Sequence, residues 1–162
     1  MRSPTLAYLC QILLEQDPQS LEYSVTCHLA KCVTEFGEKA FAQAARIADG
    51  LVEAYSRRTR IAELNDRLRK TFTGGQVVLT RGIAELPPPD KAAILRKVRE
   101  FDDFHEGNDP WGEHDFGSFE HNGVKIYWKI DYYDADIRYG SEDPCDPDIT
   151  TRVLTVLLST EY

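Results

Sequence analysis

The chain has 162 residues, of which 42% are hydrophobic and 28% are charged, a composition typical of a globular protein with a single main core. Its formal net charge of −8 is unevenly spread, because residues 100–148 hold fifteen acidic and only three basic side chains, a local charge of −12. Such a field repels nucleic acid and attracts cations or basic protein surfaces. Direct binding of DNA or RNA through this acidic half is therefore not expected.

No stretch of the sequence predicts a membrane span or a signal peptide. The apolar run from Leu6 to Leu14 is short, contains Gln11 and lacks a small-residue cleavage site. The four cysteines, Cys10, Cys27, Cys32 and Cys145, have no metal-ligand spacing. We therefore expect a cytoplasmic protein that has no cofactor and does not bind a membrane.

Three helices are predicted in the first 70 residues, over about 3–14, 18–37 and 38–70. The first two begin with Ser-Pro and Asp-Pro pairs, in which proline occupies a position where its missing N–H is harmless. Gly37 favours the end of the second helix. Gly50 weakens the third helix but need not break it.

The end of the third predicted helix is strongly basic. Residues 57–70 contain six basic and two acidic side chains. This surface could bind nucleic acid or a partner, or it could be a solvated helix that packs against the acidic half of the same molecule. Intramolecular pairing is the simpler interpretation, because the opposite charge is already present in the chain.

After residue 70, two strands and one helix are predicted in addition to the central hairpin. Residues 76–80 form a short strand, and residues 91–104 form an amphipathic helix. The Pro87–Asp90 segment is expected to be a rigid polyproline-like spacer that ends in a helix cap. Residues 151–159 are rich in β-branched residues and favour a buried strand, with a helix capped at Asp146 as the alternative.

The central feature is a predicted β-hairpin with strands at 114–121 and 124–133. Asn122-Gly123 tolerates positive φ at both centres of a type I′ turn, and apolar and polar residues alternate after it. A two-residue turn determines the register, so that Gly117 lies opposite Trp128, Glu120 opposite Lys125 and His114 opposite Asp131.

The predicted His114–Asp131 pair has two interpretations. Asp131 could orient the imidazole and make His114 a general acid or base, or the pair could simply close the open end of the hairpin. Carboxylates at Asp109, Glu113 and Asp115 could add a divalent-metal site. Because the spacing matches no zinc or EF-hand pattern, no metal ligand is assigned.

These elements predict an α+β fold, with an N-terminal helical region followed by a small, mainly antiparallel sheet around the central hairpin. We expect residues 1–60 to form a helical extension and residues 61–162 to form the α+β domain.

Four ordered segments, 64–83, 101–120, 127–134 and 140–162, resemble the DUF3768 family of bacterial proteins. The resemblance covers about residues 61–162 and implies a domain of unknown function, often encoded on plasmids and other mobile elements. His105 and Glu106 do not belong to the family motifs. The positions that match them are Asn108, Asp109, Pro110, Glu113, His114, Asp115, Phe116, Gly117, Lys129, Asp131, Tyr132, Tyr133 and Asp134.

Two functions are consistent with the sequence. The favoured one is an acidic module that occupies a basic surface of a host protein and so inhibits or modulates it, including as an anti-defence (anti-CRISPR) protein. The alternative is a hydrolase or nuclease-like enzyme that uses His114 and Asp131, with or without a divalent metal. The candidate binding residues are Asp103, Asn108, Asp109, Trp111, Glu113, Asp115, Tyr127, Lys129, Tyr133 and Asp134.

Overall fold

The structure is a computed structural model that describes residues 38–162. The two helices predicted before residue 38, together with Cys10, Cys27 and Cys32, lie outside the described residues. The chain divides into two compact units, Met1–Tyr55 and Ser56–Tyr162. The sheet and the candidate site belong to the second unit.

A single helix, α3 (Glu38–Thr71), covers the whole range of the third predicted helix and continues through Gly50. It has basic residues in its last turn, where they interact favourably with the helix dipole. Leu68 and Ile61 are buried on one side of this helix. Charged residues recur along α3, and no helix among the described residues is both long and apolar enough to cross a membrane.

The sheet has four strands in the order β1-β4-β3-β2: β1 (Gln76–Leu79), β2 (Phe116–His121), β3 (Val124–Tyr133) and β4 (Thr151–Leu158). The pairs β2–β3 and β3–β4 are antiparallel, whereas β1 joins β4 in parallel at one edge. The sheet is therefore mainly antiparallel, as predicted. The strand interpretation of the C-terminal segment is also confirmed, because β4 pairs with two neighbours.

The central hairpin has the predicted register. Phe119 lies opposite Ile126, Gly117 opposite Trp128 and Glu120 opposite Lys125. The turn residues Asn122 and Gly123 have φ values of 51° and 76°, the positive values that a type I′ turn requires. The first strand begins at Phe116 rather than at residue 114, so the hairpin is two residues shorter at its open end than predicted.

Two short helical segments connect β1 to the hairpin, and they correct two predictions. After α4 (Arg81–Ala84), helix α5 spans Pro88–Glu100. The proline run is thus not a spacer, because Pro88 and Pro89 lie in the first turn, where an N–H has no partner within the helix. The helix also ends before residue 104, since Phe101 adopts an extended conformation.

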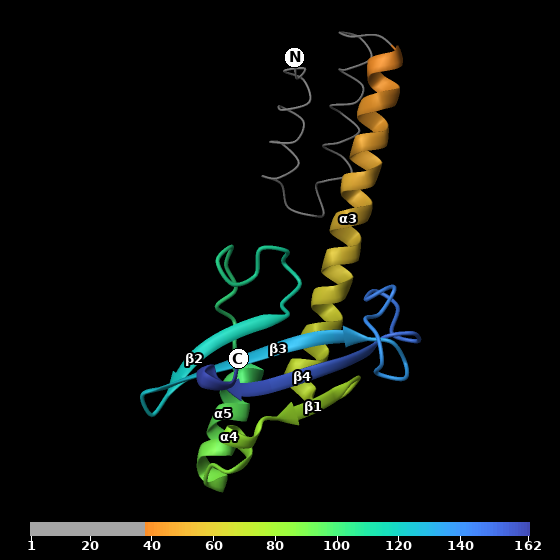
Figure 1. Ribbon diagram of the computed structural model, residues 1–162. Coiled ribbons are helices and arrows are strands. Elements are labelled where there is room, and N and C mark those ends of the chain that lie inside the picture. The colour runs from red at the N-terminus through yellow and green to blue at the C-terminus, as the bar shows by residue number, and fades with distance from the viewer. Residues whose placement is uncertain (1–37) are drawn as a thin grey trace. The chain divides into compact units, whose positions relative to one another are not determined.

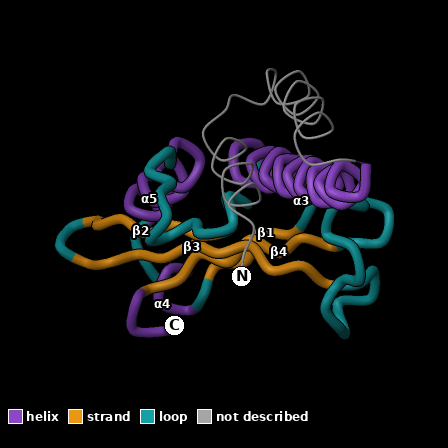
Figure 2. Tube along the Cα trace, turned by 90° about the horizontal axis from the view of Figure 1, so that it is seen from above, coloured by secondary structure: helices purple, strands orange, loops and turns teal. Residues whose placement is uncertain are grey.

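The core lies between the sheet and its helices (Figure 1). The second half of α3 and all of α5 cover one face of the sheet, and α4 lies at the other face (Figure 2). The Trp128 indole packs edge-on against the Phe101 ring, with the ring centroids 5.4 Å apart. The buried core residues are Leu68, Ile83, Ile94, Val98, Ile126, Trp128, Ile130, Leu154 and Val156.

We predict that Gly117→Ala destabilises the protein, because the added Cβ would lie 2.5–2.7 Å from atoms of the buried Trp128 indole. The expected loss in the free energy of unfolding is about 1–3 kcal/mol, measured by urea denaturation. Ser118→Ala is the control, since its side chain lies on the opposite face of β2, and it should change stability by less than about 0.5 kcal/mol. Equal losses in the two variants would contradict this packing.

Candidate functional site

The loop between α5 and β2 is shaped by its own side chains. The Asn108 side chain accepts a hydrogen bond from the His105 N–H at 2.9 Å and donates one to the Asp103 carbonyl at 2.7 Å. The Asp109 carboxylate is 4% exposed and accepts from the N–H groups of Glu113 and His114 at 2.8 and 3.2 Å. Two of the predicted binding residues, Asn108 and Asp109, therefore hold the loop in one conformation.

The imidazole of His114 lies between this loop and α3. It stacks on the Phe104 ring with a centroid distance of 3.9 Å and an interplanar angle of 8°. Its Nδ1 lies 3.4 Å from Asp66 Oδ1, and its Nε2 lies 3.8 Å from Asp109 Oδ2. The Nδ1 atom is buried and has no hydrogen-bond partner among residues 38–162.

The predicted pairing of His114 with Asp131 is wrong. His114 has a φ of 55°, a left-handed conformation that turns the chain out of the strand before β2 begins. Asp131 instead accepts from Lys129 Nζ, 2.7 Å from one carboxylate oxygen and 3.0 Å from the other. This hydrogen bond raises the pKa of Lys129.

The fully buried side chain of Asn65 joins four parts of the fold. Its amide nitrogen donates to the Glu113 carbonyl at 2.8 Å and to the Tyr132 hydroxyl at 2.7 Å. Its amide oxygen accepts from Arg152 Nε at 3.0 Å. Helix α3, the α5–β2 loop, β3 and β4 therefore meet at one amide group.

The phenol of Tyr132 extends this network. Its hydroxyl donates to the Glu113 carboxylate at 3.1 Å while it accepts from Asn65. Burial raises the pKa of Tyr132, with the nearby Glu113 carboxylate acting in the same direction. The hydroxyl therefore remains protonated at neutral pH and acts as a structural hydrogen-bond donor.

Two arginines are buried beside this network. Arg152 donates to the Asn65 oxygen and the Pro144 carbonyl, and its guanidinium lies 5.5 Å from the Tyr132 ring centroid. Burial lowers its pKa. Arg69 donates to Asp66 at 2.8 Å and to the carbonyls of residues 98 and 99 at the end of α5. Both cations bind neighbouring segments to the core.

Asn65 and the two arginines were not among the predicted site residues. The sequence contains one signal for Asn65, because it stands between Ile61 and Leu68 at the spacing of the buried helix face. A polar residue at such a position requires hydrogen-bond partners. The identity of those partners could not be read from the sequence.

Several basic residues of the 57–70 segment make ion pairs within the molecule. Arg57 makes an ion pair with Asp143 at 2.8 Å, which links α3 to the acidic half of the sequence. Lys70 and Arg69 both bind Asp66. Although burial alone would raise the pKa of Asp66, these hydrogen bonds lower it overall. The contacts favour the intramolecular interpretation of the basic stretch.

Acidic groups also lie close to one another at this end of the hairpin. Burial raises the pKa of Asp115, and the negative charges of Glu113 and Asp109 raise it further. Within residues 38–162, no group of three or more His, Cys, Asp and Glu side chains could hold a metal ion. The cluster is a local concentration of negative charge.

The remaining candidate binding residues fall into two places. Asp103 and Trp111 are exposed in the α5–β2 loop, and Trp111, at 73% exposure, is among the most exposed large hydrophobic residues of the described part of the chain. Tyr127, Lys129 and Tyr133 alternate along β3 with the core residues and so lie on the opposite face of the sheet. Asp134 follows the end of β3.

The comparison with known protein families gives one result. The model of the family described as "Protein of unknown function (DUF3768)" matches residues 79–161. This match confirms the resemblance found in the sequence motifs. No curated protein and no solved structure matches the chain.

We predict that Asn65→Ala lowers the free energy of unfolding by roughly 3–5 kcal/mol, because it leaves Arg152 and Tyr132 buried without their shared partner. Chemical denaturation measures this loss. Glu63→Ala is the control on the same helix, since Glu63 is exposed and its one ion pair within residues 38–162 is with Arg60, and it should cost less than about 0.5 kcal/mol. A small effect of Asn65→Ala would show that the network is not required for stability.

Asp115→Asn should stabilise the protein at neutral pH. The pKa of Asp115 is raised in the folded state, so folding there must accommodate an unfavourable buried charge. The unfolded chain, with a pKa near 3.8, binds fewer protons than the folded chain over the interval between the two pKa values, and stability falls as pH rises through it. Thermal denaturation should therefore show a gain at pH 7 that disappears below about pH 3.8. A loss of stability at pH 7 would contradict this account.

Proposed function

The chain belongs to the DUF3768 family, whose description assigns no function, and we propose from its surface chemistry that it is an acidic protein-binding module. The module would occupy a basic surface of a partner protein through the α5–β2 loop. The observation that carries the proposal is an exposed tryptophan, Trp111, in a loop whose exposed carboxylates have no cationic partner among the described residues.

The carboxylates of this loop are available to a partner. Asp102, Asp103 and Glu106 are exposed, and their side chains make no ion pair or hydrogen bond with any residue in 38–162. Charges of this kind attract a basic surface over a distance set by the salt concentration and accelerate association. Such charges mainly orient the partner and raise the association rate constant, and they contribute less to the affinity.

Trp111 is suited to supply the affinity. A large aromatic side chain that is buried at the centre of an interface is a frequent source of binding energy. In the free protein the ring is 73% exposed, so a partner could remove most of its surface from water. An isolated exposed aromatic is a common surface feature, but here it lies within the most acidic part of the chain.

The loop is held in shape before any partner binds. Asn108 closes it at one point, Asp109 binds two successive N–H groups, and the His114 ring stacks on Phe104. A loop that is already ordered loses less conformational entropy when it binds. The same contacts give Asn108, Asp109 and His114 a positioning role in the proposed binding.

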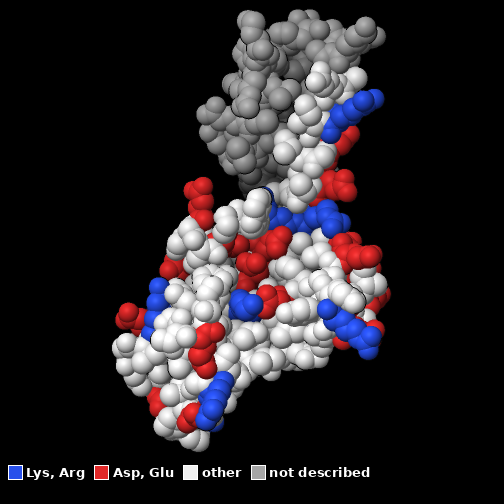
Figure 3. Space-filling model, viewed as in Figure 1, with Lys and Arg blue, Asp and Glu red and all other residues white. Residues whose placement is uncertain are grey.

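The face drawn in Figure 3 has acidic side chains gathered near its middle, beside fewer basic ones. A basic, nucleic-acid-binding surface of a host protein has the complementary charge. By occupying such a surface, the module would compete with nucleic acid and inhibit or modulate the host protein, which would suit an anti-defence role for a protein encoded on a mobile element. This partner class is part of the proposal.

The enzymatic alternative has less support from the geometry. A general base needs a hydrogen bond that orients its imidazole, but the carboxylate oxygens beside the His114 ring nitrogens lie at 3.4 and 3.8 Å, and Nδ1 has no hydrogen-bond partner among the described residues. Asp131, the expected orienting group, binds Lys129 instead. An enzyme that used His114 would have to use Asp66 or Asp109 as the orienting carboxylate.

The proposal is tested by capture of partners from host lysate on the immobilised full chain at low and high salt, followed by affinity measurement on the purified partner. Trp111→Ala should weaken binding by roughly tenfold or more. The triple variant Asp102→Asn, Asp103→Asn, Glu106→Gln should also weaken binding, and its loss of affinity should be larger at low salt than at high salt. Both variants should keep the thermal stability of the parent protein, because the altered side chains are exposed.

The control is a triple variant with the same change in net charge at exposed positions outside the loop: Gln76→Lys, Ala92→Lys and Thr160→Lys. It should bind the partner nearly as well as the parent protein. If this control loses as much affinity as the loop variant, the attraction is a property of total charge and the proposed interface is wrong.

A further inference from the structure

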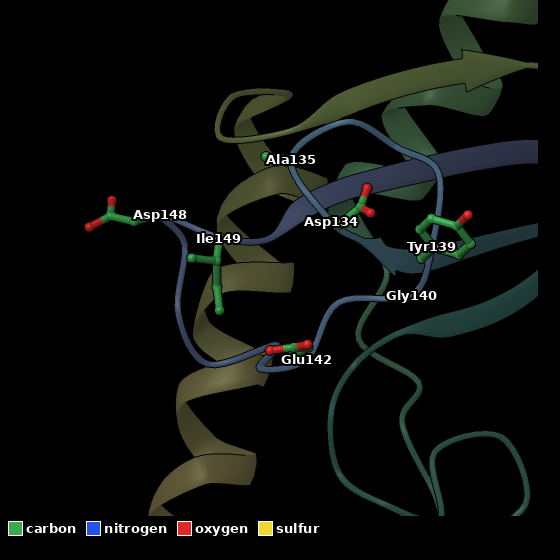
Figure 4. Close-up of a pocket in the computed structure, with 7 residues that line it drawn as sticks. All are labelled: Asp134, Ala135, Tyr139, Gly140, Glu142, Asp148 and Ile149. Carbon is green, nitrogen blue, oxygen red and sulfur yellow. The ribbon is translucent and has the colours of Figure 1, made fainter.

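The connection between β3 and β4 encloses a second surface feature, a pocket of about 460 Å³. It is lined by Asp134, Ala135, Tyr139, Gly140, Glu142, Asp148 and Ile149. In Figure 4, Asp134, Tyr139, Glu142 and Ile149 surround the opening from different sides, whereas the Asp148 carboxylate points away from it. The pocket therefore has the carboxylates of Asp134 and Glu142, the aromatic ring of Tyr139 and the aliphatic side chains of Ile149 and Ala135 around a single space.

The walls of this pocket are tied together by hydrogen bonds. The Asp134 N–H donates to the Tyr139 carbonyl at 2.9 Å, and the Ser141 N–H donates to the Tyr132 carbonyl at 3.1 Å. The hydroxyls of Ser141 and Thr150 lie 2.6 Å apart, and Thr150 also donates to the Asp143 carbonyl. These bonds join the segment after β3 to the segment before β4, so the pocket does not need a partner to form.

The charges of the pocket are not neutralised from within. Glu142 is exposed, and its carboxylate has no hydrogen bond or ion pair with the part of the chain that the structure describes. One oxygen of Asp134 accepts from the Arg138 backbone N–H at 2.9 Å, which leaves the other oxygen available. Arg138 supplies the one basic side chain in the sequence from 134 to 150, and it does not line the pocket.

The apolar wall of the pocket, formed by Tyr139 and Ile149, is also exposed to solvent. The Tyr139 side chain is 75% exposed and Ile149 is 44% exposed, so the ring and the aliphatic group face solvent beside the two carboxylates. An anion would be repelled by this lining, and a purely apolar group would leave the carboxylates without partners. The combination fits a cation that carries an apolar stem.

We infer that this pocket receives one arginine side chain of the partner protein. The inference rests on the proposed function and names the group that the acidic module recognises. The guanidinium would stack on the Tyr139 ring and direct its N–H groups toward Glu142 and Asp134, while its methylene stem would cover Ile149. Arginine fits this lining better than lysine, because its planar group stacks on aromatic rings and donates several hydrogen bonds in one plane.

The test uses the ¹⁵N-labelled full chain and N-acetyl-arginine amide as the probe, followed by NMR at low ionic strength. Saturable shifts are expected at the amides of Tyr139, Gly140 and Ile149, with a Kd on the order of 1 mM for so small a ligand. The neutral isostere N-acetyl-citrulline amide should produce no saturable shifts. N-acetyl-lysine amide should bind several-fold more weakly.

Variants separate the pocket from the general charge of the protein. Glu142→Gln and Tyr139→Ala should each weaken binding of the arginine probe about three- to fivefold. Asp136→Asn is the matched control, because Asp136 is an exposed acid in the same connection that does not line the pocket, and it should leave the Kd unchanged. Shifts spread over the whole acidic half, an equal loss in Asp136→Asn, or equal affinity for the lysine probe would each overturn the inference.

The outcome is independent of the α5–β2 loop, because the probe is a single amino acid and the altered residues lie between β3 and β4. If the arginine probe fails while Trp111→Ala still weakens binding of the partner as predicted, the pocket assignment is wrong and the proposed function stands. If the probe binds as expected but no protein partner depends on Trp111, the proposed function is wrong and the pocket is a guanidinium site of another purpose.

Discussion

The buried amide of Asn65 is the constraint on which the described fold most depends. It is the common hydrogen-bond partner of the Glu113 carbonyl, the Tyr132 hydroxyl and the Arg152 guanidinium, which come from three different segments. The amide nitrogen and the amide oxygen of this buried side chain have all their hydrogen-bond partners only when these three groups are in place. One side chain therefore couples the position of the second half of α3 over the sheet, the path of the α5–β2 loop and the burial of a cation in β4.

This polar interior explains how an acidic surface can be presented in a defined shape. Of the three arginines that join segments of the fold, Arg57 pairs with Asp143 of the acidic half, whereas Arg69 binds Asp66 and Arg152 binds uncharged groups in the interior. Among residues 38–162, exposed carboxylates without partners occur in the α5–β2 loop, which the side chains of Asn108 and Asp109 hold in shape, and in the β3–β4 connection, which backbone hydrogen bonds hold in place. A partner with a basic surface would meet charge and exposed aromatic rings on a rigid support, which favours fast and specific association.

Much of the fold was predictable because its signals are local. The Asn122-Gly123 turn and the alternation after it determine the hairpin register, and β-branched residues predict β4. The parallel edge formed by β1 needed long-range contacts that no local pattern contains. The predicted pairing of His114 with Asp131 was wrong for a similar reason. The positive φ of His114 is stabilised by a hydrogen bond to Asp109 and by stacking on Phe104, and both contacts depend on the conformation of the loop.

The central claim is that charge in the α5–β2 loop guides a basic partner to Trp111. The most direct measurement is the association rate constant of the purified partner as a function of salt concentration, determined by stopped-flow tryptophan fluorescence. The account predicts a fall of at least about tenfold between roughly 50 and 500 mM salt, with little change in the dissociation rate. An association rate that stays within about twofold over this range would contradict it.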